Sequence, residues 1–464
     1  MLPTLLSGKQ MRTVMTAVVC FLLAGFVSAV SADDLFPLYP CIRNNVMFWR
    51  HVYETFSSNQ GIVHDQEDLS IIYGIIPLVD RDVPGAAESN RQAMRRAKRR
   101  YRDILRKLAD GRPPANRREL MVAALFPTAG PGTYRRAMEN IRVQTGQKDS
   151  FIAGFVRSGA YIDEIKRIFV SYGLPEQLAY LPHVESSFNH RARSRSGAVG
   201  TWQFILSTGR EFMTINQQVD ERYDPLLSSH AAARFLRQNY EKLGTWPLAI
   251  TAYHHGQNGM IRALRAKGDF ENIVREYRSK GFGFASRNYY AEFLAALQVA
   301  GNLERDPSVK RDSPLTPLTV SFPGTWWVRD LFRFVPVSGE TLARLNPALR
   351  SAVLEGGKPL PEDYPIRLPD TPAVRRALEL ETAGVTTVSS DGSHRYYLVR
   401  PGDTAGRIAR RFQVPLELLI RINDLDESAA IFSGRRLRIP VITPVSVRDQ
   451  VVLLNSQGKR SPDG

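Results

Sequence analysis

One glutamate near the middle of the chain is placed where a carboxyl group could do acid and base chemistry. Glu185 lies near the end of an apolar helical pattern, beside Val184 and close to Leu181 and Phe188. Apolar surroundings favour the neutral form of a carboxyl group, so we expect its pKa to be raised. Such an acid can protonate a glycosidic oxygen near neutral pH. On this pattern alone the alternative stays open, because a glutamate at a helix end is more often solvated or a cap.

Three sequence blocks in a fixed order give this glutamate a context. The first runs from Glu185 to Arg210 and opens with Glu-Ser-Ser-Phe-Asn, the second is Asp220–Asp224, and the third is Leu248–Gly256. Together they resemble the signature of lytic transglycosylases of the goose-lysozyme-like superfamily, glycoside hydrolase family 23. The resemblance covers roughly residues 149–304.

This resemblance implies a lysozyme-like, all-α catalytic domain that cuts the β-1,4 bond between MurNAc and GlcNAc in peptidoglycan. Glu185 would protonate the bridging oxygen and then, as a carboxylate, take the proton of the MurNAc C6 hydroxyl, which attacks C1. The product would be a 1,6-anhydro sugar. One carboxyl group acting twice is enough, because the nucleophile belongs to the substrate. No cofactor and no metal are implied.

The resemblance also implies which residues hold the substrate. Ser194 and Gln203 fall at positions that bind the sugars and peptide groups, and Tyr253 falls where a phenol hydroxyl approaches the catalytic carboxyl group. His254 stands where the family usually has asparagine, and it adds a group that titrates near pH 6.5. Leu206 replaces the usual proline. Three of these residues could instead be purely structural: Ser194 as a loop cap, Gln203 as an ordinary buried amide and Tyr253 as a core residue.

A second carboxylate would make a lysozyme-type hydrolase of the same fold. Asp220 and Asp224 are the candidates. We interpret them as structural, pairing with Arg222 or capping the helix that follows Pro225. Their distance from Glu185 decides the matter, and the sequence does not give it.

Helical elements are expected to position these residues, so the fold class is mainly α. Residues 149–304 show helical periodicity throughout, with turn signals between segments. An N-terminal helical region is expected over residues 33–148. It includes the basic helix Arg91–Lys107, whose apolar side we expect to pack while its charged face stays solvated. Contact of that charged face with an anionic wall or membrane surface is the alternative.

Two similar segments follow the helical domain. Val337–Asn346 and Val414–Asn423 carry valine, leucine, an aliphatic residue and asparagine at the same offsets, which indicates an internal repeat. We expect a degenerate first repeat over residues 314–370, a linker over 371–394, a second repeat over 395–441 and a tail over 442–464.

The second repeat opens with a strand, a Pro-Gly-Asp-Thr turn and a helix start. Its expected βααβ order resembles LysM, a module that binds glycans containing N-acetylglucosamine. The resemblance implies that two turns line a shallow groove, although they could also be turn residues only. These residues are Gly402, Asp403, Thr404, Ile431, Phe432, Ser433 and Gly434. The first repeat lacks the Gly-Asp-Thr turn.

The ends and the charge of the chain indicate export. Lys9 and Arg12 precede an apolar run that ends in small residues at Ala32, so residues 1–32 are typical of a cleaved signal peptide; an uncleaved anchor is the alternative. The net charge of +16 favours an anionic polymer as partner. We therefore expect a location in the periplasm or cell envelope. If residues 1–32 are removed together with Cys20, Cys41 is the remaining cysteine, and we expect it to be a buried or neutral thiol.

The predicted function is thus that of a peptidoglycan lytic transglycosylase held on the wall by LysM. A lysozyme-type hydrolase and a non-catalytic wall-binding protein are the alternatives. We expect peptidoglycan strands as the partner and a monomeric protein. Nucleic acid is not expected, because the basic helix lacks interleaved aromatic residues and export conflicts with it.

Overall fold

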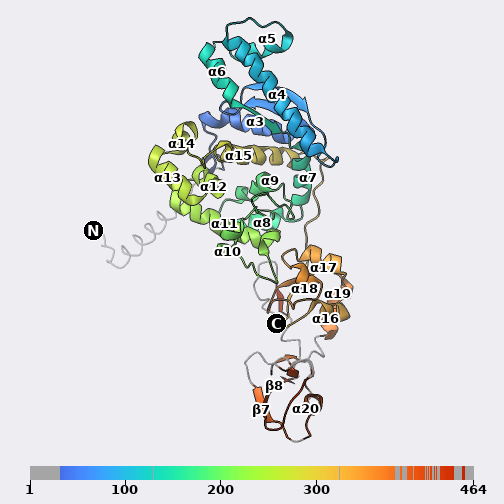
Figure 1. Cartoon of the computed structure of the whole chain (residues 1–464). Helices are drawn as coiled ribbons and strands as arrows, with labels where there is room; N and C mark the ends of the chain where they lie inside the picture. The colour runs from blue at the N-terminus through green and yellow to red at the C-terminus, as the bar shows by residue number, and fades with distance from the viewer. Residues whose placement is uncertain are drawn as a thin grey trace, which may run out of the picture. The chain divides into compact units, whose positions relative to one another are not determined.

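The protein is described from a computed structural model, which is mainly α-helical as predicted (Figure 1). It describes residues 32–381 apart from 129 and 323, and beyond them 387–388, 394–400, 402–412, 414, 416, 419–420, 423, 425, 429–440, 442–443 and 452–454. The predicted signal peptide therefore lies almost wholly outside the described residues. None of the described helices is long and apolar enough to cross a membrane.

The chain divides into two compact units. The first combines Met1–Asp149 with Leu236–Gly301, and the second combines Ser150–Phe235 with Asn302–Gly464. Each unit is described by itself.

A three-stranded antiparallel sheet lies in the first unit, where the sequence predicted helices. Its strands are β1 (Gln60–Asp65), β2 (Ile72–Pro77) and β3 (Ile141–Thr145), in the order β2-β1-β3. Short apolar runs such as these do not reveal their period, and β3 pairs with β1 across a long stretch of chain. Gly74 lets the long helix approach, because a Cβ atom there would lie 2.3 Å from Tyr101 Oη.

Helices surround this sheet as the sequence predicted. The basic helix α4 (Ala86–Ala109) buries Tyr101, Leu105 and its other apolar positions, while most of its arginines stay exposed. The predicted solvated charged face on a packed helix is therefore confirmed. The other helical elements of residues 32–140 are α2 (Ala32–Leu35), η1 (Pro40–Ile42), α3 (Arg43–Glu54), α5 (Arg117–Ala124) and α6 (Pro131–Asn140).

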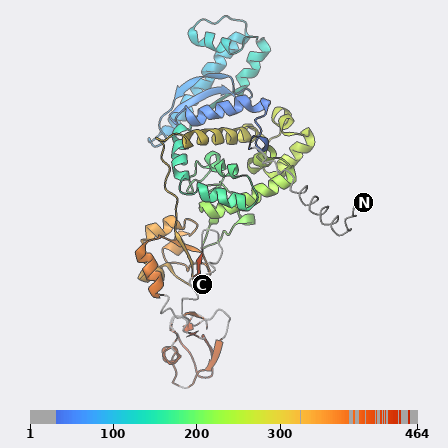
Figure 2. The same cartoon turned by 180° about the vertical axis from the view of Figure 1, so that it is seen from behind.

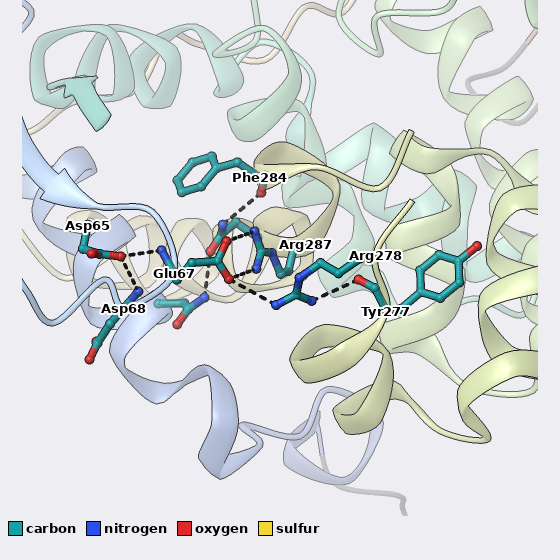
Figure 3. A network of polar contacts seen from close by, with 9 residues as sticks. Asp65, Glu67, Asp68, Tyr277, Arg278, Phe284 and Arg287 are labelled. Carbon is teal, nitrogen blue, oxygen red and sulfur yellow. Dashed lines mark hydrogen bonds and ion pairs between the residues drawn. The ribbon is translucent and has the colours of Figure 1, made fainter. Parts of the chain in front are cut away.

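Residues distant in sequence complete the first unit. Helices α3 and α15 (Phe284–Glu304) run side by side in both views (Figures 1 and 2), and Asn45 Nδ2 donates to Asn288 Oδ1 over 2.8 Å. The loop after β1 is tied to α15 and to the segment before it, because Glu67 pairs with Arg287 on α15 and with Arg278 in the preceding segment (Figure 3). The remaining helices are α12 (Trp246–His255), α13 (Gln257–Lys267) and α14 (Phe270–Glu276).

The second unit begins with a helical core around Trp202. This side chain is fully buried, stacks on Phe169 at 5.4 Å, and donates from Nε1 to Ser229 Oγ over 2.8 Å. The elements here are α7 (Lys148–Ser158), α8 (Ile162–Ser171), η2 (Glu176–Tyr180), α9 (Leu181–Glu185), α10 (Leu206–Phe212), η3 (Glu221–Tyr223) and α11 (Pro225–Leu243).

The first repeat has its own apolar core in the same unit. Strand β4 (Leu318–Ser321) pairs antiparallel with β5 (Ile366–Leu368) and with β10 (Val452–Leu454). Four helices accompany these strands: α16 (Val328–Phe334), α17 (Gly339–Leu345), α18 (Ser351–Leu354) and α19 (Pro372–Glu381).

The second repeat is a separate small core. Strand β7 (His394–Leu398) pairs antiparallel with β8 (Arg436–Pro440), and α20 (Ala405–Arg411) packs Ile408 against them. The short pair β6 (Thr387–Val388) and β9 (Ile442–Thr443) flanks it in sequence.

Candidate active site

Glu185 is the last residue of α9, and the chain reverses directly after it. Ser186 N and Phe188 N both donate to Pro182 O, each over 3.1 Å. Ser187 and Phe188 have φ values of 50° and 55°, which side-chain-bearing residues rarely adopt. Such strain persists only where the surroundings fix it, and it is concentrated at functional sites.

Three neighbours fix this turn. Arg157 Nη2 donates to Ser187 O over 2.7 Å, and Ser186 Oγ donates to Thr201 O over 2.8 Å. Gly154 on α7 allows close approach, since a Cβ atom there would lie 2.7 Å from Ser187 O. The backbone that carries Glu185 is thus held from α7 and from the loop around Thr201.

An apolar layer lies under α9. The ring of His183 is 1% exposed and stacks on Phe151 at 4.7 Å, while Phe188 packs edge-on at 4.7 Å. Burial lowers the pKa of His183 to about 3, so the ring is neutral near pH 7. Glu185 itself stays partly exposed, as a group that must reach a substrate requires. Its role as proton donor stays a prediction.

Ser194 lies in the loop after α9 and is held by the loop itself. Its hydroxyl accepts from Ala198 N over 2.9 Å and contacts Ser196 Oγ at 2.9 Å. Its backbone N–H donates to Ala198 O over 2.8 Å. These bonds give Ser194 a structural role, and sugar binding by its hydroxyl stays a prediction.

Gln203 closes the same loop in a left-handed conformation, with φ of 49°. Its Nε2 donates to Gly200 O over 2.9 Å and to Ala192 O over 3.3 Å. Gly200 must be glycine, because a Cβ atom would lie 1.8 Å from Arg222 O. The amide nitrogen is used internally, which leaves Oε1 of Gln203 as the atom suited to accept from a substrate.

The two aspartates considered as second carboxylates are structural, as the sequence analysis interpreted them. Asp220 is 2% exposed and accepts from Arg222 Nε over 2.9 Å and Nη2 over 2.8 Å. Asp224 is fully buried, and its Oδ1 accepts from the backbone N–H groups of Leu226 and Leu227 at the start of α11, each over 3.0 Å. Both carboxylates are occupied by partners within the protein.

Tyr253 and His254 lie on α12 in the first unit, whereas Glu185, Ser194 and Gln203 lie in the second. The Tyr253 side chain is partly exposed. His254 Nδ1 lies 3.2 Å from Ser286 Oγ, and its ring stacks on Tyr289 at 5.1 Å. Desolvation, helped by neighbouring His255, lowers the pKa of His254 below its ordinary value. The charge that the sequence suggested near pH 6.5 is therefore shifted to lower pH.

The two predicted turns of the LysM groove come together. Gly434 N donates to Val399 O over 2.8 Å, which joins the second turn to the strand end before the first. Asp403 accepts from Arg400 N and from Tyr397 Oη, each over 2.8 Å, and Thr404 caps α20. Beside Gly434, Phe432 is 68% exposed. An exposed aromatic ring beside a fixed polar turn is suited to binding sugar rings.

Sequence reasoning missed several residues around the site. Arg157 and His183 gave no local signal, because their roles depend on packing against distant segments.

Cys41 fits its prediction as a neutral thiol. Burial and a hydrogen bond from its thiol to Glu271 raise the pKa of the thiol to about 11, so it is neutral.

The described residues thus combine a helical part that carries Glu185 with a small module in which α20 packs against the strands β7 and β8. Residues 166–275 match the Transglycosylase SLT domain and residues 397–440 match the LysM domain. The chain is homologous to membrane-bound lytic murein transglycosylase D of Escherichia coli K12, with 26% identity over 272 residues. The match covers 54% of this chain and 57% of that protein, so the chain spans little more than half the length of this relative.

Two further similarities are shorter or weaker. The transglycosylase of enterobacteria phage PRD1 is 33% identical over 84 residues, which cover 18% of this chain and 30% of the phage protein. Among solved structures, an inactive mutant of the lytic transglycosylase Slt from Pseudomonas aeruginosa matches 50% of this chain and 36% of its own, with 17% identity and a TM-score of 0.28. The family resemblance stated from the sequence is confirmed by the two domain matches and by the homologous transglycosylase.

Proposed function

We propose that this chain is a peptidoglycan lytic transglycosylase of the cell envelope, with Glu185 as its acid and base. The observation that carries the proposal is the placement of Glu185. It ends α9 above a neutral apolar layer, stays partly exposed, and precedes a turn in which two consecutive residues have positive φ. A rigidly held carboxyl group is what proton transfer to a bound sugar requires.

The reaction balances with this one carboxyl group. Glu185, protonated, gives its proton to the oxygen between MurNAc C1 and GlcNAc C4 as the C1–O bond breaks, which releases the GlcNAc 4-hydroxyl. The carboxylate then takes the proton of the MurNAc C6 hydroxyl as that oxygen bonds to C1. Glu185 is regenerated, no water is consumed, and the product is a 1,6-anhydro sugar. The occupied carboxylates Asp220 and Asp224 favour this mechanism over one with two acting carboxylates.

Binding to the wall would come from the LysM module. Its exposed Phe432 and the fixed turn at Asp403 support a glycan site there. The same turn residues as in the sequence prediction, Gly402 to Thr404 and Ile431 to Gly434, would line it.

Mass analysis of soluble products from purified sacculi tests the proposal. The wild-type protein should release anhydromuropeptides. Glu185→Gln should lower their rate of release by at least about 100-fold, because the loss of a general acid typically lowers a rate by this factor or more. Glu211→Gln is the matched control, because Glu211 is an exposed glutamate in the same unit. Its activity should equal that of wild type.

The other outcomes separate the alternatives. Products with reducing ends instead of anhydro ends would identify a hydrolase. Binding to sacculi without turnover, equal in wild type and Glu185→Gln, would identify a wall-binding protein without catalytic activity.

A further inference from the structure

A basic cavity of about 650 Å³ lies in the second unit. Its lining combines the segment between residues 193 and 223 with two residues of the first repeat, and includes neither Glu185, Ser194 nor Gln203. Its charged residues are Arg193, Arg210, Asp220, Arg222, Arg350 and Lys358. A volume in this range is typical of sites for small ligands, about 300–1,000 Å³.

The one carboxylate in the lining is already occupied. Asp220 accepts two hydrogen bonds from Arg222 and pairs with Arg350 Nη2 at 3.2 Å. Two arginines of the lining, Arg222 and Arg350, are thereby partly neutralised, and Arg222 is only 7% exposed.

Three cations of the lining have no carboxylate partner among the described residues. Arg193 and Arg210 are exposed, and Lys358 Nζ donates to the neutral amide oxygen of Gln217. Like charges around one cavity repel one another, and an anion bound among them would lower this repulsion. The guanidinium groups are planar forks that match carboxylates in two-bond geometry.

The two walls of the cavity are held together by the backbone. Val219 forms a β-bridge with Leu349, Asp220 N donates to Ala348 O over 2.8 Å, and Arg350 N donates to Gln218 O over 2.9 Å. The cavity is therefore formed before any ligand arrives, which lowers the cost of binding.

We propose that this cavity binds the carboxylate groups of a short acidic peptide, namely the peptide stems attached to the glycan. The identity of the peptide rests on the proposed function. The cations come from both walls and from separate segments, an arrangement that suits several carboxylates along one peptide better than a single compact anion. Apolar side chains between them, among them Val199 and Ile215, suit its hydrocarbon parts. The first repeat would then take part in reading the substrate.

Calorimetric titration of the intact protein tests this proposal without any turnover. The probe is a synthetic tripeptide, alanyl-γ-glutamyl-diaminopimelic acid, and the paired probe is the same tripeptide with its carboxylates amidated. The acidic tripeptide should bind and the amide should not. The double variant Arg193→Gln/Arg210→Gln should weaken binding of the acidic probe about tenfold or more.

The control is matched in charge and in place. Arg191→Gln/Arg195→Gln removes two exposed arginines from the loop that carries Arg193, and neither of them lines the cavity. Its affinity should stay within about twofold of wild type. Equal affinity of all three proteins for the acidic tripeptide would overturn the proposal, and so would equal binding of the amide.

Inorganic pyrophosphate is the third probe. If it binds with the same dependence on Arg193 and Arg210 while the tripeptide does not, the cavity is a phosphate site and the proposal is wrong. The product analysis of sacculi is a separate measurement. A protein that releases anhydromuropeptides but fails to bind the tripeptide would refute this proposal and leave the proposed function standing.

Discussion

The first repeat and the LysM module have the same framework, yet they present different surfaces. In each, an asparagine donates from Nδ2 to the carbonyl four residues earlier: Asn346 to Leu342 O and Asn423 to Leu419 O, both over 2.9 Å. The separation from Trp327 to Asn346 equals that from Thr404 to Asn423. The asparagine and the residue before the first helix therefore have the same spacing in both segments, which supports the predicted repeat.

The turn before the first helix is where they differ. Gly402, Asp403 and Thr404 of the LysM module correspond to Thr325, Trp326 and Trp327 of the first repeat. Thr404 caps its helix with a side-chain oxygen, and Trp327 provides no side-chain cap.

The first repeat instead uses its polar groups against the helical domain. Arg367 on β5 pairs with the fully buried Asp224, and Arg350 pairs with Asp220. Trp326 packs on Phe322 at 5.0 Å within the repeat. One copy of the framework thus keeps a polar turn, and the other is docked on the domain beside it through ion pairs. Four predictions test this difference.

The largest expected effect comes from breaking the docking pair. Arg367→Leu would leave Asp224 charged, buried and without its cation, which typically costs about 3–5 kcal/mol. Burial lowers the pKa of Arg367 to about 10, so its guanidinium group is still charged at neutral pH. Thermal unfolding of the intact protein should show a clearly lower midpoint.

Arg375→Leu is the control for this prediction. Its ion pair with Asp370 has side chains 53% and 35% exposed, and exposed pairs contribute little, about 0–1 kcal/mol. Similar shifts of the midpoint for both variants would show that Arg367 does not hold a buried pair.

The shared asparagine gives the second comparison. Asn346 is fully buried, and besides its bond to Leu342 it donates to Arg367 O over 2.7 Å and accepts from Arg367 N over 2.8 Å. Asn346→Ala would leave buried backbone groups unpaired at about 1–3 kcal/mol. Asn423 is partly exposed, so water can replace some of its bonds and Asn423→Ala should cost less. Hydrogen exchange of the backbone amides in each repeat of the intact protein measures the two destabilisations. A larger loss of protection in Asn423→Ala than in Asn346→Ala would contradict this prediction.

Glycan binding gives the third comparison. Phe432 of the LysM module and Phe332 of the first repeat are exposed aromatic side chains, at 68% and 38%. In a Glu185→Gln background, which prevents digestion, Phe432→Ser should weaken binding to sacculi about tenfold, or about 1.4 kcal/mol. Phe332→Ser should leave it unchanged, as measured by co-sedimentation. Weaker binding of Phe332→Ser with unchanged binding of Phe432→Ser would place wall binding in the first repeat and contradict this prediction.

The sequence predicted those features whose signal is local. The helix that ends at Glu185, the cap at Thr404 and the helix-capping role of Asp224 each depend on residues within a few positions. The sheet of β1, β2 and β3 was missed, because its strands are short and β3 lies far along the chain from its partner β1.

The basic cavity was missed for the same reason. Arg350 and Lys358 are more than a hundred residues from Arg193 and Arg210 in sequence, and no spacing rule connects them. Likewise, the repeat suggested a shared fold, but the docking of one copy depends on Arg367 meeting a carboxylate of another domain. Such pairings follow from tertiary structure and not from periodicity.

The smallest expected effect is a pH dependence confined to the LysM turn. The backbone N–H of Arg400, and then the hydroxyl of Tyr397, hold the pKa of Asp403 below its ordinary value. A folded-state pKa below the unfolded one means that the stabilisation is present at neutral pH and is lost as the pH falls through the folded value. The amide signal of Arg400 in NMR spectra should therefore titrate at a lower pH than an unperturbed aspartate. Asp403→Asn should abolish this titration, and the Leu360 amide, which donates to Trp326 O over 2.7 Å at the corresponding turn, should show no such step. A step at the Leu360 amide, or one at Arg400 that persists in Asp403→Asn, would mean that the two turns do not differ in the way their sequences and hydrogen bonds imply.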